Sequence, residues 1–189
     1  VDQITGIYED LYRSVYYQKY EESKLVWEEG DSLPYTGGAP ITAPEAITDV
    51  NNVINYTEDT YDMVAAVSGG AYLSYDMYDA PMDLLVDSTL IGCPNAMWNG
   101  TFAQFCLQVT GDDTVAHEWG HAYTEYTHNL IYAWQPGALS ESYSDIFGAS
   151  VEFYAKPNDA NWTIGEDMGG TIRDMADPNA FGDPDTYLG

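Results

Sequence analysis

The sequence predicts an α+β domain, and three observations lead to this expectation. Short runs rich in tyrosine and valine, typical of strands, lie before residue 33, and strand-like and turn-like segments return over 71–110. Three other stretches carry helix signals, apolar residues at helical spacing in one and typical end residues in the other two. A hydrophobic content of 45% suits a packed core, and 189 residues fit one domain, or one domain and part of another.

The first half of the chain predicts two strands and a helix. RSVYYQKY and KLVWEEG predict strands that end at Gly30, and LPYTGGAP at 33–40 predicts a turn-rich connection. A helix is expected from Pro44 until Ser68-Gly69-Gly70 ends it. The apolar residues that recur at helical spacing within it are Ile47, Val50, Ile54, Tyr61 and Val64.

The second half predicts two further helices. One is expected from near Thr110 to about Asn129, since Thr110 and Asp113 have the spacing of a capping box and asparagine tolerates a left-handed cap. The next follows Pro136-Gly137 and continues through EFYA at 152–155. The tail after it is rich in Gly, Asp and Pro, and DPNAFGDPD predicts consecutive turns.

The charge of the chain limits its partners. With 31 Asp and Glu against 5 Lys and Arg, the net charge is −26, so a nucleic-acid partner is not expected. The acidic residues have two interpretations, a solvated surface or carboxylates gathered around calcium. No apolar run of membrane-spanning length and no basic-then-apolar leader is seen, so no membrane partner is expected. A start at Val1 rather than Met predicts a mature or excised piece.

Two cysteines, Cys93 and Cys106, stand thirteen positions apart. The two strands of a hairpin could bring them together, and a disulfide would imply an oxidising compartment. Two free buried thiols are the alternative. The spacing leaves both open.

HEWGH at 117–121 carries the clearest chemical pattern. Residues four apart lie on one face of a helix, so His117 and His121 can hold one metal ion. Glu118 is rotated by about 60° from His121 around the helix axis, so it can face a water molecule beside that ion as a general base. Two ordinary surface histidines are the alternative, but the pattern uses two of only three histidines in the chain.

A catalytic zinc site needs a third protein ligand, with the fourth position left to water. Thr124 and Thr127 stand where a metzincin has Gly and His, so that class is excluded. His128 lies about 10 Å beyond His121 along the helix axis, and Glu125 is one turn too far. The third ligand must therefore come from another element.

The next predicted helix offers carboxylates. Glu141, Asp145 and Glu152 lie within about 40° of one another around its axis, and three like charges on one stripe repel unless cations neutralise them. Apolar neighbours leave little of this helix free to face water, which argues against a merely solvated face. We therefore expect Glu141 to bind zinc, Asp145 to orient a zinc-binding histidine and Glu152 to bind calcium.

On these residues the sequence resembles thermolysin and its neutral-metallopeptidase relatives, the gluzincins. The matching segments are NAMWNG (95–100), HEWGH with the Glu of GALSESYSD twenty residues later, NLIY (129–132), EFYA (152–155), IGED (164–167) and IRDMADPNAFGDPDTY (172–187). KLVWEEGD and DVNNVINYTEDTYDMV (49–64) match more loosely, so the resemblance covers roughly residues 24–189. It implies a zincin-like fold, in which a twisted, mostly antiparallel sheet packs on long helices and the HEWGH helix forms the floor of a central cleft.

The resemblance also implies roles for individual residues. His117, His121 and Glu141 would bind catalytic zinc. Glu118 would polarise the attacking water, and Tyr132 would stabilise the oxyanion of the tetrahedral intermediate.

Further residues have implied roles in orienting a zinc ligand, in binding the substrate and in binding calcium. The resemblance implies that Asp145 orients His117, and that Arg173 binds the substrate carbonyl and lines the pocket after the scissile bond. Asn95 and Ala96 would hydrogen-bond the substrate backbone along an edge strand. Four positions match calcium ligands of the family: Asp113, Glu152, Asn161 and Glu166.

The sequence departs from the family at several positions. Ser140 replaces the Asn that usually precedes the zinc Glu, and Asn161 and Thr163 stand where other members carry carboxylates. In the family, a helical C-terminal domain beyond the DPDTY segment supplies a further His, and no histidine follows His128 here. Residues 1–189 are therefore expected to be the N-terminal portion of the catalytic domain, with the helical C-terminal domain absent.

These expectations together define a function. The chain is expected to be the catalytic part of a secreted, zinc-dependent endopeptidase that also binds calcium and hydrolyses polypeptide substrates, with Glu118 as general base. The alternative is a non-catalytic domain that binds zinc and calcium for structure or interaction. Glu118 argues against it, since a structural site has no use for a base beside an open coordination position.

Overall fold

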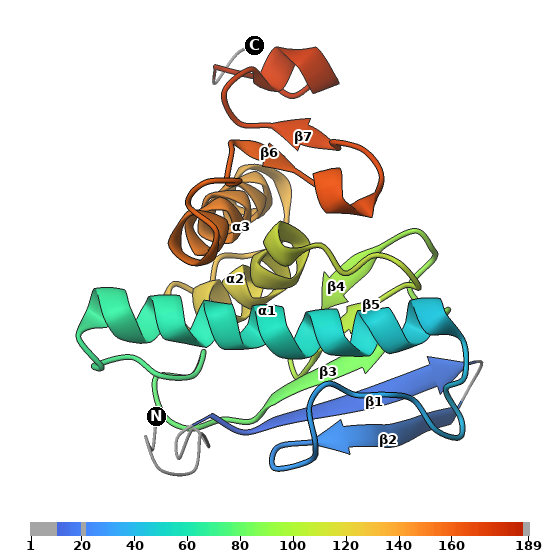
Figure 1. Ribbon diagram of the computed structural model, residues 1–189. Helices are drawn as coiled ribbons and strands as arrows, with labels where there is room; N and C mark the ends of the chain where they lie inside the picture. The colour runs from blue at the N-terminus through green and yellow to red at the C-terminus, as the bar shows by residue number, and fades with distance from the viewer. Residues whose placement is uncertain (1–10, 20–21, 187–189) are drawn as a thin grey trace.

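A five-stranded sheet and three long helices make up most of the molecule, which confirms the predicted α+β class (Figure 1). This computed structural model describes residues 11–19 and 22–186. Tyr20, the last residue of the first predicted strand, and the two ends of the predicted 1–189 domain lie outside these ranges. The strands of the large sheet are β1 (Arg13–Lys19), β2 (Glu22–Glu28), β3 (Met82–Val86), β4 (Ala96–Trp98) and β5 (Ala103–Phe105).

The sheet has the strand order β2-β1-β3-β5-β4, and it is mixed rather than mostly antiparallel as predicted. The β1–β2 and β4–β5 pairs are antiparallel, while β1–β3 and β3–β5 are parallel. The β1–β3 pair is parallel because the connection from β2 to β3 crosses over the sheet through a helix instead of turning back directly. The β3–β5 pair is parallel because the chain passes through edge strand β4 before it returns as β5 beside β3. Strand β4 forms one edge of the sheet, so one side of its backbone has no neighbouring strand among the described residues.

Helix α1 (Pro44–Ser68) makes this crossing and lies over one face of the sheet (Figure 1). It begins with proline in its first turn and ends before Gly69, which adopts the left-handed conformation with φ 64°, as predicted. Val50, Ile54 and Tyr61 are buried, and Val50 and Ile54 belong to a core cluster that also contains Leu84 of β3. The helical spacing in the sequence therefore identified the buried face of α1.

Helices α2 (Asp112–Thr127) and α3 (Trp134–Ala155) pack against each other at close range. A Cβ atom at Gly148 of α3 would lie 2.6 Å from the backbone oxygen of Asp113, and one at Gly120 of α2 would lie 3.0 Å from Cα of Ser144. Both glycines thus allow a helix separation that a side chain would prevent. This contact places the HEWGH segment of α2 against α3.

The ends of these two helices differ from the prediction. No side-chain hydrogen bond caps α2, whose N-cap is Gly111, because the hydroxyl of Thr110 donates instead to Oδ1 of Asp49 at 2.7 Å. Helix α3 begins at Trp134, ahead of the predicted Pro136-Gly137 boundary. The left-handed cap at Asn129 is confirmed, with φ 47° directly after the C-cap residue His128.

Small elements follow α3: β6 (Thr163–Ile164), the 3-10 helix η1 (Glu166–Met168), β7 (Arg173–Asp174) and the 3-10 helix η2 (Pro178–Phe181). Cys93 and Cys106 form a disulfide with a Cα–Cα distance of 5.6 Å, which settles the choice that the spacing left open. The bridge encloses the β4–β5 hairpin. None of the helices in the described part of the chain combines the length and the apolar character that crossing a membrane requires.

Candidate metal centre and active-site cleft

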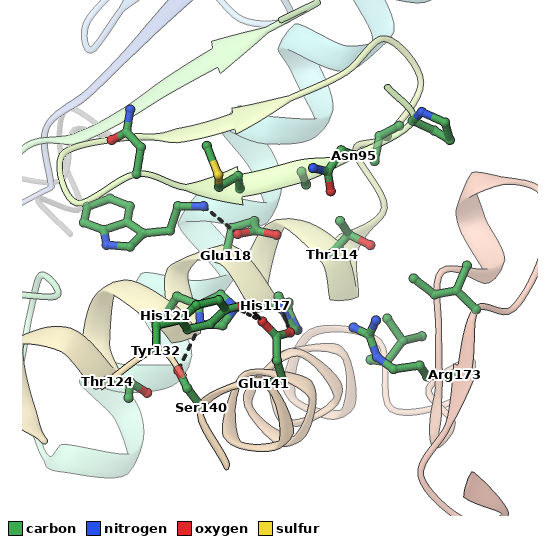
Figure 2. A pocket seen from close by; sticks show the side chains of 18 of the residues that line it. Asn95, Thr114, His117, Glu118, His121, Thr124, Tyr132, Ser140, Glu141 and Arg173 are labelled. Carbon is green, nitrogen blue, oxygen red and sulfur yellow. Dashed lines mark hydrogen bonds and ion pairs between the residues drawn. The ribbon is translucent and has the colours of Figure 1, made fainter. Parts of the chain in front are cut away.

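His117, His121 and Glu141 converge at one point between α2 and α3 (Figure 2). Their ligand atoms lie within 4.8 Å of one another, and among the described residues this is the one such group of His, Cys, Asp or Glu side chains. The two histidines project from successive turns of α2, and Glu141 reaches across from α3. The structure thus brings together the three residues predicted to bind zinc.

The spacing of these atoms fits a zinc ion. Ligands at about 2.0–2.1 Å in a tetrahedron lie about 3.3 Å from one another. The Nε2 atoms of His117 and His121 are 3.0 Å apart, and they lie 3.3 Å and 3.4 Å from the two carboxylate oxygens of Glu141. Two imidazoles and one carboxylate are also a ligand set that zinc takes in catalytic sites.

A chain of charged groups lies behind His117. Its Nδ1 atom is 2.8 Å from Oδ1 of Asp145, as an ion-pair contact rather than a well-aligned hydrogen bond. Arg173 donates to both oxygens of Asp145, from Nε at 2.7 Å and from Nη2 at 2.6 Å. Arg173 lines the cleft, as expected of a substrate-binding residue, but its guanidinium is engaged with Asp145. Its position therefore connects the cleft wall to a histidine of the metal centre.

The protonation of the centre follows from these contacts. Burial lowers the pKa of His117, but the carboxylates of Asp145, Glu141 and Glu118 outweigh burial and raise it to about 9. Burial alone would raise the pKa of the Glu141 carboxyl, but its hydrogen bonds with His117, His121 and Tyr132 hold that pKa well below its usual range. Ser140, in place of the Asn found in the family, has its Oγ 3.2 Å from Nδ1 of His121.

Glu118 lies beside the metal centre, and 94% of its surface is buried. Its Oε2 accepts a hydrogen bond from the backbone N–H of Trp98 in β4, at 2.7 Å. Burial raises the pKa of its carboxyl, while the nearby charges of His117 and His121 lower it in part. A buried carboxylate with a raised pKa, in contact with the same cleft as the proposed metal ligands, is suited to accept and release a proton.

Tyr132 stands at the opposite side of the centre, on the segment between α2 and α3. Its hydroxyl donates to Oε1 of Glu141, and its ring lies 5.8 Å from that of His121. With 68% of the residue exposed, it can move toward a bound molecule without disturbing the core.

The cleft above the centre has a volume of about 1180 Å³ and is lined by Asn95 and Ala96 as well as by the groups described above. Ala96 begins edge strand β4, and Asn95 directly precedes it. The backbone oxygen of Asn95 accepts from Cys106, and its side chain donates to the backbone of Ile91 at 3.1 Å. The predicted substrate-binding strand therefore forms one wall of the cleft.

The residues predicted to bind calcium gather where α2, α3 and the segment before β6 meet. Asp113 accepts a hydrogen bond from the backbone of Gly165, and Oε2 of Glu152 accepts one from Asn161 at 3.4 Å. The side-chain amide of Asn161 donates to Oε1 of Glu166, whose Oε2 is buried without a hydrogen-bond partner. Their ligand atoms do not form a group within 4.8 Å, as those at the zinc position do.

Burial and mutual repulsion act on this cluster. Burial is the main cause that raises the pKa of Asp113 to about 6 and that of Glu152 to about 7, and the neighbouring charges of Asp112 and Glu166 add to it. Buried acids with raised pKa values, together with an unpartnered oxygen on Glu166, fit an oxygen-coordinated cation such as calcium.

The sequence analysis missed two contacts. In the first, Nζ of Lys156 lies 2.6 Å from Oδ2 of Asp112, next to the acidic cluster. Because the chain has only five basic residues among many acids, an ion pair of each basic residue with an acid could have been expected. Trp98 contacts Glu118 through its backbone, and it lies within the NAMWNG segment, but a main-chain contact between two distant elements leaves no residue pattern.

Fold and site together define a class of protein. A helix with HExxH, a glutamate of the following helix beside the two histidines and a buried carboxylate facing the cleft resemble the parts of a zinc-dependent hydrolase whose third ligand is glutamate.

Comparisons with known proteins specify the class further. Residues 128–189 match a family model described as the alpha-helical domain of thermolysin metallopeptidase. The chain is 37% identical to the thermostable neutral protease NprT of Geobacillus stearothermophilus over 179 residues, which cover 86% of this chain and 30% of that protein. It is 41% identical to thermolysin of Alicyclobacillus acidocaldarius subsp. acidocaldarius over 149 residues, which cover 70% of this chain and 26% of that protein.

The fold agrees with the sequence matches. The precursor of protealysin, a metalloproteinase from Serratia proteamaculans, superposes with a TM-score of 0.67 and 27% identity over 84% of this chain and 49% of that one. The chain is thus similar in sequence and fold to thermolysin-like metallopeptidases, as its motifs predicted. It spans about 30% of the length of the curated relatives that it matches.

Proposed function

We propose that the protein is a zinc endopeptidase that hydrolyses peptide bonds in polypeptides. One observation carries this proposal: buried Glu118 stands beside a three-ligand zinc position, and both face a cleft with an edge strand in its wall. A peptide can add to such an edge as a further strand, held by backbone hydrogen bonds that do not depend on sequence.

Each residue has a part in this reaction. A zinc ion held by His117, His121 and Glu141 would polarise the peptide carbonyl and make a water molecule more acidic. Glu118 would take the proton from the attacking water on Oε1, since Oε2 already accepts the hydrogen bond from Trp98, and would pass it to the leaving amine.

Other residues would hold the substrate and its developing charge. Asn95 and Ala96 would bind the peptide backbone, and the hydroxyl of Tyr132 would turn from Glu141 to the oxyanion. Arg173 would fix Asp145, and through it the orientation of His117, while its exposed edge meets the substrate. The similarity to proteases named thermolysin and neutral protease supports this assignment.

Substitution of Glu118 tests the proposal. Glu118→Gln keeps the size and the acceptor for Trp98 but cannot take a proton, so kcat should fall by at least about two orders of magnitude, the scale of a lost general base. The assay uses a quenched peptide, the protein expressed from its complete reading frame, and zinc content measured in parallel. The matched control is Glu22→Gln, on the exposed edge strand β2, which should retain wild-type activity. Near-wild-type hydrolysis by the zinc-loaded Glu118→Gln variant would exclude this mechanism.

We also propose that calcium binds at Asp113, Glu152, Asn161 and Glu166, and that the protein acts outside the cell. The buried acidic cluster supports the first point. The disulfide supports the second, since such bonds persist in oxidising compartments.

A further inference from the structure

Trp98 is attached to helix α2 at two points. Its backbone N–H donates to Oε2 of Glu118 at 2.7 Å, and its indole Nε1–H donates to Oε2 of Glu125 at 2.6 Å. We infer that Glu125 is a positioning residue that acts through Trp98 to hold edge strand β4 against the general base. This inference rests on the proposed function.

The two glutamates are spaced so that one tryptophan can reach both. Glu118 and Glu125 are seven residues apart, so they lie within about 20° of each other around the helix axis and about 10 Å apart along it. The two carboxylates converge on Trp98, which meets one with its main-chain N–H and the other with its indole N–H. Two attachment points fix both the position of the strand and its rotation about its own axis, which a single hydrogen bond would leave free.

Aromatic packing fixes the direction of the indole N–H. The ring of Trp98 meets Tyr75 edge to face at 5.1 Å and lies tilted at 5.6 Å from Trp119, which is fully buried in α2. Tyr75 in turn meets Tyr126, the neighbour of Glu125, at 5.1 Å. The indole plane therefore has little freedom, and its N–H points at the Glu125 carboxylate.

The strand is also fixed at its other end. The Cys93–Cys106 disulfide lies just before Asn95, so the proposed substrate-binding residues Asn95 and Ala96 stand between a covalent bond and the attachment of Trp98 to α2. If Glu125 released the indole, the strand could move away from Glu118 at the Trp98 end only. A displacement of about 1 Å between substrate and catalytic group is enough to lower the rate by up to about a hundredfold.

Four variants test this role in the protein expressed from its complete reading frame, with zinc content matched. Trp98→Phe removes the indole N–H but keeps an aromatic ring, Glu125→Ala removes the acceptor, and Glu125→Gln keeps an acceptor without the charge. Trp98→Phe and Glu125→Ala should each lower kcat about tenfold with KM within about twofold of wild type, and Glu125→Gln should restore kcat to within about twofold. In the double variant, which combines Trp98→Phe with Glu125→Ala, kcat should fall no further than in either single variant, because both substitutions remove the same contact. Glu22→Ala, an exposed glutamate on the far edge of the sheet, is the charge control.

A second measurement does not depend on activity. The chain has five tryptophans, and the Trp98 indole N–H resonance in a ¹⁵N correlation spectrum is identified by its loss in Trp98→Phe. It should shift in Glu125→Ala and stay in place in Glu125→Gln. Three results would overturn the inference: an unshifted indole resonance in Glu125→Ala, a wild-type kcat in Glu125→Ala, or reductions in kcat that multiply in the double variant. Wild-type protein that binds zinc but cleaves no peptide would overturn the proposed function instead, and the resonance would still report whether Glu125 holds Trp98.

Discussion

At the scale of single residues, His117 connects the proposed zinc position with the pair of Asp145 and Arg173 behind it. Its Nε2 faces the zinc position, and its Nδ1 contacts Asp145, which Arg173 holds with two hydrogen bonds. The sequence identified all of these residues, because helical spacing and the matching motifs place them on known faces. It did not predict that Arg173 pairs with Asp145, since that contact depends on where the β6–β7 hairpin lies relative to α3.

Zinc binding should release a proton from His117. The pKa of His117 in the metal-free centre is raised to about 9, so at pH 7.5 the ring is protonated, whereas zinc needs a neutral imidazole. Calorimetric titration in two buffers of different ionisation enthalpy should show about one proton released at pH 7.5, with the number falling as the pH rises through 9.

The variant Asp145→Asn tests whether the proton released on zinc binding comes from His117. It removes the carboxylate that contributes most to the raised pKa of His117, so it should reduce the proton release and weaken zinc binding by about 10–100-fold. A binding enthalpy that is the same in both buffers at pH 7.5 would contradict the assigned protonation of His117.

At the scale of elements, the close contact of α2 and α3 sets the geometry of the site. All three proposed zinc ligands lie on these two helices, so the distance between the helices decides whether Glu141 reaches the histidines. Both helices were predicted from residues at their ends, Thr110, Asp113 and Asn129 for one and Pro136-Gly137 for the other, but their separation was not predicted. A glycine within a helix does not reveal which neighbour it admits.

Gly148→Ala tests this dependence. The new Cβ would meet the backbone oxygen of Asp113 at 2.6 Å, and backbone cannot move aside as a flexible side chain can. The free energy of unfolding, measured with urea, should fall by about 1–3 kcal/mol, the usual cost of overpacking, and zinc affinity should fall with it. Gly170→Ala, where no atom lies within 4 Å of the new Cβ, is the control and should change neither. Equal stabilities of the two variants would show that α2 and α3 can separate without loss.

At the scale of the whole molecule, acidic charge dominates. The net charge is −26, and two acids of the predicted calcium site, Asp113 and Glu152, are buried. The composition predicted the excess charge, but only the structure shows that Lys156 neutralises Asp112 beside this cluster. The same limit applied to the sheet. The sequence predicted the two N-terminal strands individually and residues 71–110 only as strands and turns, and the parallel pairing of β1 with β3 joins residues too far apart in sequence for a local pattern to reveal.

Stability without calcium should fall as the pH rises from about 5 to 7. Asp113 and Glu152 have pKa values of about 6 and 7 in the folded protein, above their ordinary values of 3.8 and 4.5. The folded state therefore binds more protons than the unfolded state in this window, so raising the pH removes stability. Melting temperatures in a chelator should decrease over this range, and excess calcium should raise them most at pH 7, since calcium binds the ionised carboxylates.

Glu152→Gln separates this effect from general repulsion. The variant should lose about half of the pH dependence, because Asp113 remains, and most of the response to calcium, while the Glu22→Gln control should keep both. A melting temperature that is unchanged between chelator and calcium at pH 7 would refute the calcium site.

The parallel pairing of β1 with β3 also bears on how the chain folds. Residues 20–81, including all of α1, separate the two strands, so the centre of the sheet cannot form from a local hairpin. Closing such long loops before their contacts form is slow, which favours folding in milliseconds to seconds rather than microseconds. Until β3 has left the ribosome, β1 and β2 form at most an isolated hairpin, which is marginally stable in water. During synthesis the side of β1 that later pairs with β3 is therefore an open strand edge, available to other nascent chains until β3 covers it.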